Sequence, residues 1–185
     1  MHPWKLRCAT RVIHGGGVIA YATETVWGLG CNPADARAVQ RIWQLKGRSA
    51  DKGLILIAES LTRLIPWIAP LSEQQTESLR SRSGQPVTWI VPARPETPFW
   101  LTGNRATLAV RVTDHPIVSA LCTASRLPLV STSANPAGRP PARSPLMVRR
   151  YFDDWLDLIV SGTAPGSGRP SEIRELASGR VIRAS

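Results

Sequence analysis

The stretch Gly53-Leu54-Ile55-Leu56-Ile57-Ala58 decides the fold of this chain. Consecutive aliphatic side chains over the length of a strand are typical of a strand that is covered on both faces of a sheet. Outward from this stretch, similar apolar runs recur, separated by segments with apolar residues at helical spacing and punctuated by Gly and Pro. The sequence therefore predicts layered α and β structure, in the α/β class.

The same patterns locate the individual elements. Strands are expected at residues 17–22, 53–58, 87–91, 108–112, 127–131, 158–160 and 181–183. Helices are expected from Asn32-Pro33 to Lys46, from Ser72 to near Gly84, from His115-Pro116 through Ala124, and from Leu146 to Phe152. The stretches 135–145 and 164–170 are rich in Pro, Gly and Arg, and we expect them to form ordered loops or lids.

Length and composition indicate one globular domain. The 185 residues are 43% hydrophobic and no linker or repeat divides them, so we expect a single domain over residues 1–185. No apolar run approaches the roughly 20 residues of a membrane span, and no signal-peptide pattern begins the chain. We therefore expect a cytoplasmic protein without membrane contact. Three cysteines without CxxC spacing favour reduced thiols over disulfides or a zinc site.

The charge balance predicts an anionic partner. The formal net charge is +10, and most of the excess is arginine, which suits two-pronged contacts with phosphate or carboxylate. A nucleotide needs only a few arginines, whereas a nucleic acid needs a broad basic surface. The cations are spread along the chain, and only Arg149-Arg150 are adjacent. Composition leaves three interpretations open: a nucleotide site, an RNA-binding surface, or a solvated basic surface.

Polar side chains suited to ligand binding follow the predicted strands. Thr23-Glu24-Thr25 offers two hydroxyls and a carboxylate for a small amino or hydroxy compound, although threonines that cap a turn would give the same pattern. Ser131-Thr132-Ser133-Ala134-Asn135 offers uncharged hydrogen-bonding groups for phosphate or carboxylate. Lys46 and Arg48 lie at the predicted end of a helix, and Gly47 allows an extended backbone that would let both converge on one ligand. A solvated cationic pair is the alternative.

Two common kinds of catalytic site are excluded by the motifs. A serine hydrolase is not favoured, because the chain has no GxSxG nucleophile elbow and its three histidines lie in no recognisable triad. A Walker ATPase is not favoured either. No GxxxxGK[ST] loop is present, and the glycines at 15–17 precede a predicted strand instead of linking a strand to a helix.

Five blocks of sequence, taken in order, resemble one family. They are Ala22-Thr23-Glu24-Thr25-Val26-Trp27-Gly28-Leu29-Gly30, Lys46-Gly47-Arg48 with Lys52 to Leu56, Leu108 to Val112 with His115-Pro116, Ser131 to Asn135, and Pro170 to Arg174. The blocks resemble those of the YrdC/TsaC family of threonylcarbamoyl-AMP synthases, in its single-domain bacterial form. The resemblance implies a mixed, twisted sheet with helices on both faces and a large basic cavity.

The resemblance also implies a reaction and its participants. L-threonine, bicarbonate and ATP would give threonylcarbamoyl-adenylate and pyrophosphate, the first step toward threonylcarbamoyl-adenosine at position 37 of tRNA. ATP would enter as a substrate, and Mg²⁺ would be held mainly by its phosphates and by water, so no protein metal ligands are expected. The expected functional partners are the tRNA threonylcarbamoyl transferase components, and direct binding of tRNA or other RNA is a further expectation.

The resemblance assigns roles to individual residues. Lys46, Arg48, Ser133 and Asn135 would be catalytic. Threonine and its carbamate would contact Thr25, Arg111, Ser133 and Ser171. The nucleotide would contact Lys46, Arg48, Thr107, Asn135, Arg143 and Arg183. Arg143 is assigned from its place in a Pro- and Arg-rich loop.

Two rival functions are compatible with parts of the sequence. A nonenzymatic RNA-binding module acting in rRNA maturation would use the same positive charge. A carbamoyl-adenylate enzyme of the hydrogenase-maturation type would share the family blocks, but such proteins carry acylphosphatase and zinc-finger segments that have no counterpart in this sequence.

Overall fold

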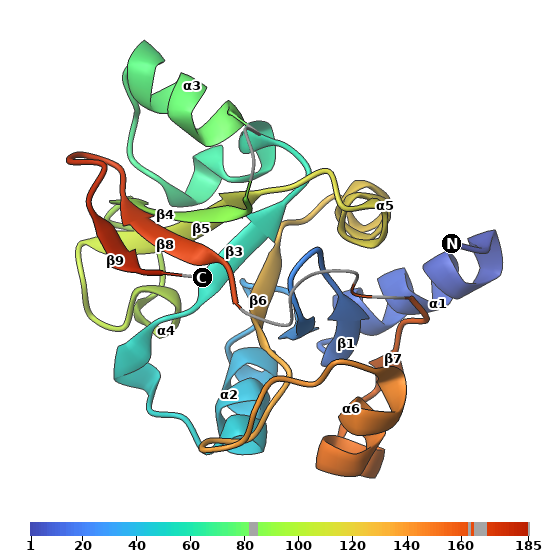
Figure 1. Cartoon of the computed structure of the whole chain (residues 1–185). Helices are drawn as coiled ribbons and strands as arrows, with labels where there is room; N and C mark the ends of the chain where they lie inside the picture. Colours follow the sequence, from blue (N-terminus) through green and yellow to red (C-terminus); the bar gives the residue numbers. More distant parts are fainter. Residues whose placement is uncertain (82–84, 163, 165–169, 185) are drawn as a thin grey trace.

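The computed structural model describes residues 1–81, 85–162, 164 and 170–184. Its strands form one sheet in the order β7-β1-β2-β6-β3-β5-β4-β8-β9 (Figure 1). The strands are β1 Ile19–Ala22, β2 Trp27–Gly30, β3 Ile55–Ala58, β4 Val87–Pro92, β5 Thr107–Val112, β6 Leu129–Ser133, β7 Leu158–Ile159, β8 Glu172–Glu175 and β9 Val181–Arg183. Because β3 and β5 are parallel and β2 and β6 antiparallel, the sheet is mixed, as the family resemblance implies.

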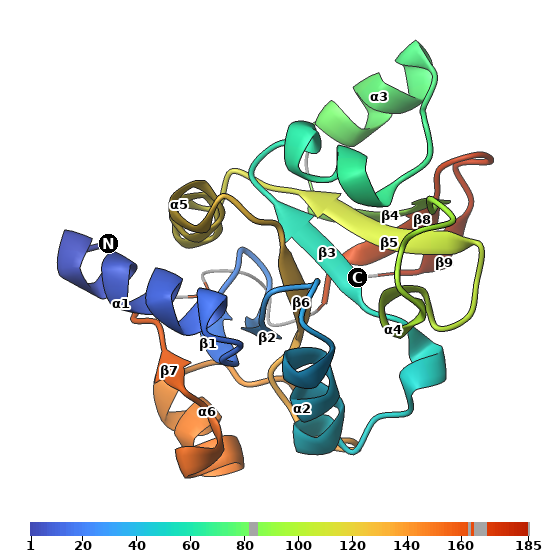
Figure 2. The same cartoon turned by 180° about the vertical axis from the view of Figure 1, so that it is seen from behind.

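The helices lie on both faces of this sheet. They are α1 Pro3–His14, α2 Ala36–Lys46, α3 Glu73–Arg80, α4 Phe99–Thr102, α5 Pro116–Ser125 and α6 Pro145–Phe152. Short 3₁₀ turns lie at η1 Ala50–Lys52, η2 Leu61–Arg63, η3 Ile65–Trp67 and η4 Asp153–Trp155. Figures 1 and 2 show α1 and α5 side by side, while α2 lies beside β6.

The stretch 54–58 confirms the prediction of a strand that is buried on both faces. Leu56 and Ile57 in β3 are both fully buried, but they belong to different apolar clusters. Leu56 packs in the cluster that contains Val39 and Ile42 of α2, whereas Ile57 packs in the cluster formed with α1 and α5. Side chains of successive strand residues point to opposite faces, so β3 is the shared wall of two cores.

Several elements differ from the sequence expectation. The stretch Trp27–Gly30, which is not among the predicted strands, is a fully buried strand, because β2 pairs with β1 on one side and β6 on the other. Helix α2 begins at Ala36 instead of Asn32-Pro33, because the Asp35 side chain accepts hydrogen bonds from the amides of Arg37 and Ala38. The sequence patterns also missed α1, α4 and β8.

Other boundaries agree with the expectation or lie beyond the described residues. Ser72 caps α3 with Gln75 in a reciprocal capping box, and the helix ends at Arg80. The predicted end near Gly84, and residues 165–169 of the predicted loop 164–170, lie outside the described residues. Helices α5 and α6 occupy their predicted places.

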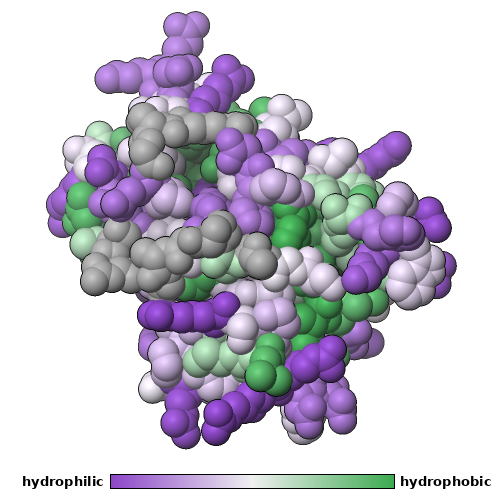
Figure 3. Space-filling model, turned by 45° about the vertical axis from the view of Figure 1, so that its right-hand side comes forward, coloured by the Kyte–Doolittle hydropathy of each residue, from purple (hydrophilic) through white to green (hydrophobic). Residues whose placement is uncertain are grey.

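The surface has no single dominant patch on the face shown in Figure 3. There, hydrophilic side chains are spread around the outline and apolar ones lie between them. Among the described residues, no helix is long and apolar enough to cross a membrane.

Truncating Leu56 to alanine should destabilise the fold far more than the same change on the surface. Leu56 is fully buried, so Leu56→Ala should cost about 3 kcal/mol through lost burial and a residual cavity. Leu146 of α6 is 76% exposed, and Leu146→Ala should cost about 0.5 kcal/mol or less. Urea unfolding of both variants measures the difference, and equal costs would contradict the shared-core description of β3.

Candidate functional site

A cavity of about 470 Å³ lies over the central strands of the sheet. Strands β2, β3, β5 and β6 contribute to its walls, as do the start of β8 and the end of β9. A cavity of this volume falls in the range of small-molecule sites. Its polar lining consists of hydroxyl groups and cations: Thr23, Thr25, Arg48, Lys52, Thr102, Arg105, Thr107, Arg111, Ser131, Thr132, Ser133, Ser171 and Arg183.

One end of the cavity is crowded with cations. Arg48 donates from Nη2 to the carbonyl oxygens of Lys52 (3.2 Å) and Gly53 (2.9 Å). Its Nε is buried and has no hydrogen-bond partner among the described residues. Burial, and then the charges of Arg183 and Arg105, lower the pKa of Arg48. Like charges held this close repel one another, so this end of the cavity favours a polyanion.

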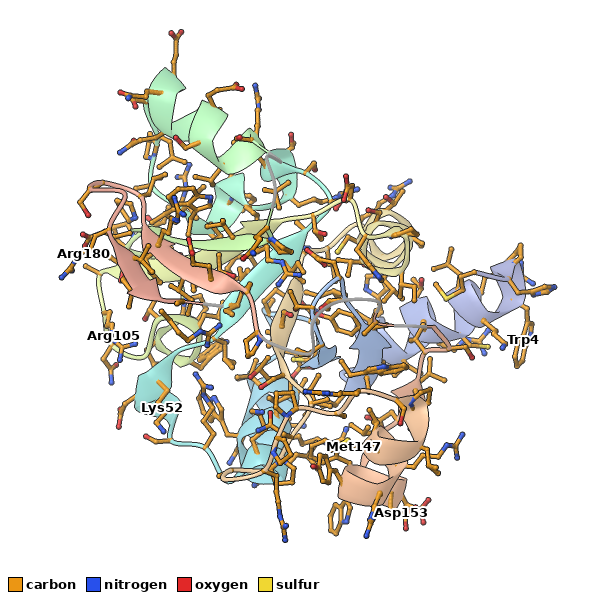
Figure 4. The ribbon with its side chains drawn as sticks, in the orientation of Figure 1. Trp4, Lys52, Arg105, Met147, Asp153 and Arg180 are labelled. Carbon is orange, nitrogen blue, oxygen red and sulfur yellow. The ribbon has the colours of Figure 1, made fainter. Side chains whose placement is uncertain are left out.

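The remaining cations frame the same end. Arg183 of β9 donates from Nη2 to the carbonyl oxygen of Ser171 (2.7 Å), and burial lowers its pKa. Figure 4 shows Lys52 and Arg105 on the same side of the molecule, next to η1 and α4. The Ser171 hydroxyl is 2.7 Å from the Thr88 hydroxyl, which ties the start of β8 to β4.

The other end of the cavity holds an arginine that is paired with a carboxylate. Arg111 of β5 is 5% exposed, and its Nε donates to Glu24 Oε1 at 3.0 Å while Nη2 lies 2.5 Å from the same oxygen. The Thr113 hydroxyl donates to Glu24 Oε1 at 2.9 Å. This pairing fixes the plane of the guanidinium. A buried arginine is tolerable here because its charge is compensated.

Next to this pair, His115 caps the start of α5. Its backbone N–H donates to the Thr113 hydroxyl at 3.1 Å. Burial lowers the pKa of His115, with Arg111 acting in the same direction and Glu24 and Asp114 opposing it. Burial thus favours the neutral form of the imidazole, and Arg111 is the charged group that lines the cavity here.

The turn after β6 carries the predicted serine and asparagine. The Ser133 hydroxyl donates to Asn135 Oδ1 at 2.6 Å, and Asn135 Nδ2 donates to the carbonyl oxygen of Arg139 at 2.6 Å. The Lys46 ammonium donates to Asn135 O at 2.8 Å, to Asn135 Oδ1 at 3.3 Å and to the carbonyl oxygen of Ser133. Burial, and then the charge of Arg48, lower the pKa of Lys46 to about 8.

The structure brings most of the predicted site residues together. Seven of them line the cavity: Thr25, Arg48, Thr107, Arg111, Ser133, Ser171 and Arg183. Lys46 and Asn135 lie immediately behind Ser133, bonded to each other and not part of the lining. Arg143 is exposed on the loop before α6 and does not line the cavity.

Sequence reasoning missed the roles of three residues. Glu24 was grouped with its neighbouring threonines, but its ion pair with Arg111 crosses 87 positions of sequence. Arg105 belonged to none of the five blocks, and Thr23 was not assigned to the ligand although it lines the cavity. The signal available for Arg105 was its position two residues before Thr107, at the start of a predicted strand.

The fold and this cavity define an α/β protein with a cavity of small-molecule size, which carries a cluster of arginines and, separately, an arginine–glutamate pair. The family model described as "Telomere recombination", for Sua5, YciO and YrdC proteins, matches residues 11–185. The chain belongs to this Sua5/YciO/YrdC family.

Relatives and solved structures extend the comparison. Threonylcarbamoyl-AMP synthase of Cellvibrio japonicus is 49% identical over 181 residues, which is 98% of this chain and 96% of that protein. The protein of that name from Nitrosococcus oceani is 50% identical over 180 residues, covering 97% of each chain. The crystal structure of P. abyssi Sua5 complexed with L-threonine is 32% identical with a TM-score of 0.90, covering 99% of this chain and 54% of that one. The chain thus spans about half the length of that Sua5 protein.

Inorganic tripolyphosphate should stabilise the folded protein by relieving the repulsion among the cavity arginines. At a ligand concentration of about 100 times Kd, mass action raises the free energy of unfolding by about 2.7 kcal/mol. Arg183→Ala should remove most of this gain, whereas Arg180→Ala, on an arginine that is 72% exposed and outside the cavity lining, should keep it. Denaturant unfolding with and without tripolyphosphate measures the gain. Equal gains in both variants would place the polyanion elsewhere.

Proposed function

We propose that this chain makes threonylcarbamoyl-AMP and pyrophosphate from L-threonine, bicarbonate and ATP, for the threonylcarbamoyl-adenosine at position 37 of tRNA. The observation that supports this most directly is the cavity with two chemically different ends, the Arg111–Glu24 pair and the cluster of arginines. Full-length relatives at about 49% identity carry the name of this synthase.

The Arg111 end suits L-threonine. The guanidinium, fixed by Glu24, would receive the threonine carboxylate in a two-pronged contact. Thr25 and Ser171 line the same cavity and would offer hydroxyl groups to the threonine side chain and amine. The neutral Arg111–Glu24 pair also matches a zwitterion better than an isolated cation would, because both charges of the amino acid find an opposite charge nearby.

The arginine end suits ATP. Arg48 and Arg183 would contact the triphosphate, with Arg105 and Lys52 extending the positive field at the mouth. Thr107 would contact the nucleotide from the start of β5. Arg143 would reach the phosphates only after a movement of its loop, so it does not belong to the proposed clamp in this conformation. Mg²⁺ would be held by phosphate oxygens and water.

The residues can support the chemistry without a covalent nucleophile. The threonine amine attacks the carbon of bicarbonate and water leaves, giving a carbamate. A carbamate oxygen then attacks the α-phosphorus of ATP, and the bond to the bridging oxygen breaks as pyrophosphate leaves with the electron pair. Ser133 lines the cavity and would hold the carbamate, with Asn135 behind it. The arginines would neutralise the charge on the leaving pyrophosphate. The rate enhancement would therefore come from positioning and electrostatic stabilisation.

The labile adenylate suggests a partner. We propose that the transferase components of the tRNA modification accept it directly from the open mouth of the cavity. Direct RNA binding is a second proposal, and the exposed Trp4, Arg7 and Arg11 of α1 favour it, since the first 23 residues carry no acidic side chain.

Changing Arg111 to lysine should impair threonine use selectively. Lysine keeps the charge but not the planar fork, so the KM for L-threonine should rise about 10-fold or more while the KM for ATP changes less than about 2-fold. Arg63→Lys is the matched control, because Arg63 also pairs with a glutamate, Glu59, but outside the cavity lining. Initial-rate kinetics with each substrate varied separately measure the effect. An equal rise in both KM values for Arg111→Lys would argue against a threonine end.

Pyrophosphate release tests the proposed reaction itself. The natural chain should release pyrophosphate from ATP only when L-threonine and bicarbonate are both present, and threonylcarbamoyl-AMP should appear in equal amount. Asn135→Ala should lower the rate about 100-fold, because the turn that places Ser133 loses its side-chain contacts. If well-folded protein released none but bound RNA with strong salt dependence, the RNA-binding alternative would replace the synthase.

A further inference from the structure

The ammonium group of Lys46 is fully occupied by protein oxygens. A lysine ammonium has three N–H donors and no acceptor. In this structure Nζ donates to the carbonyl oxygen of Ser133, to the carbonyl oxygen of Asn135 at 2.8 Å and to Asn135 Oδ1 at 3.3 Å. Donors and acceptors therefore match in number, and no N–H is left for a ligand.

The surroundings of Lys46 agree with this count. The residue is 5% exposed and does not line the cavity. Its pKa is lowered to about 8 by burial and by the charge of Arg48. A lysine that is paired with an anion has its pKa held up, whereas a buried lysine among neutral carbonyl oxygens has it lowered. Contact with a phosphate would require breaking at least one of the three hydrogen bonds.

These hydrogen bonds tie helix α2 to the turn after β6. The connection runs in both directions, since the backbone N–H of Ala137 donates to the carbonyl oxygen of Lys46 at 2.7 Å. Asn135 Oδ1, which receives the Lys46 ammonium, also receives the Ser133 hydroxyl at 2.6 Å. The position of the Ser133 side chain therefore depends on Lys46.

Arg48 has the opposite arrangement. Helix α2 ends at Lys46, and Gly47 takes a left-handed backbone conformation with φ of 57°, which redirects the chain. As a result, Arg48 lines the cavity while Lys46 lies behind it. Backbone carbonyls hold one Nη of Arg48, and its buried Nε has no partner among the residues that the structure describes. Arg48 thus lines the polyanion end of the cavity with a charge that no carboxylate among the described residues compensates.

We propose that Lys46 is a positioning residue that holds Ser133 and Asn135 in place, and that Arg48 is the member of the pair that contacts the phosphates of ATP. This inference rests on the proposed function. Lys46 and Arg48 are similar in charge and lie two positions apart in sequence, but in this proposal Lys46 has a structural role and Arg48 binds the ligand.

The experiment compares Lys46→Met with Arg48→Met. Methionine keeps an unbranched apolar stem at each position and removes the charge. Lys46→Met should lower kcat about 100-fold, as expected for a misplaced reacting group, while the Kd of ATP from calorimetry changes less than about 3-fold. Arg48→Met should raise the Kd of ATP about 10-fold or more, because it removes a charge-assisted contact. Equal weakening of ATP binding by both substitutions would overturn the proposal.

A measurement on the natural chain covers the case in which Lys46→Met does not fold. The hydrogen-bond couplings between Lys46 Nζ and the carbonyl carbons of Ser133 and Asn135, followed by NMR of ¹⁵N- and ¹³C-labelled protein, should persist when ATP is added. Loss of these couplings, or a new coupling between Nζ and a phosphorus of ATP, would mean direct contact with phosphate and would overturn the proposal. Failure of the proposed function itself is separate, since it would appear as no threonylcarbamoyl-AMP from the natural chain.

Discussion

The pairing of β6 with both β2 and β3 is the constraint on which the rest of this structure depends. Leu29 lies opposite Thr132 on one side of β6, and Ile57 opposite Leu129 on the other. All other pairings lie within one half of the sheet or the other, so among the described strands β6 alone joins the halves. The same strand ends in Ser133, which places the polar turn at the junction. The pairing of β6 therefore both joins the two halves of the sheet and places the polar turn at the cavity.

The arginines of the cavity differ in whether a carboxylate of the protein compensates their charge. Arg111 is compensated by Glu24, which makes one end of the site nearly neutral and geometrically fixed. Arg48 and Arg183 donate hydrogen bonds to backbone carbonyl oxygens, but neither forms an ion pair with a carboxylate among the described residues. The uncompensated arginines cost stability in the free protein, and a polyanion recovers that cost on binding. Under the proposed function, this difference in charge would direct the amino acid and the nucleotide to different parts of the cavity.

Much of the fold could be predicted from the sequence, because the signals concerned are local. The aliphatic run of β3 and the capping serine of α3 each act within a few residues. Strand β2 could not be predicted, because Trp27–Gly30 is held by neighbours on both sides, and one of them, β6, begins at residue 129. Helix α1 was missed because only Ala9 and Ile13 of it are fully buried, so its apolar stripe is short.

The same difference between local signals and contacts that are distant in sequence applies to the site. The segments that carry Thr25 and Ser133 follow predicted strands and Arg48 follows a predicted helix, whereas the role of Arg111 was assigned from the family resemblance alone. The roles of Glu24 and Lys46 depend on contacts 87 or more positions away in sequence, and no local pattern contains such contacts.

A crystal structure with L-threonine and a non-hydrolysable ATP analogue tests the central claim most directly. We expect the threonine carboxylate on Arg111, the triphosphate on Arg48 and Arg183, and the Lys46 ammonium still bonded to Ser133 and Asn135. A triphosphate seated on Arg111, or on an ammonium of Lys46 that has left its three oxygens, would contradict the account.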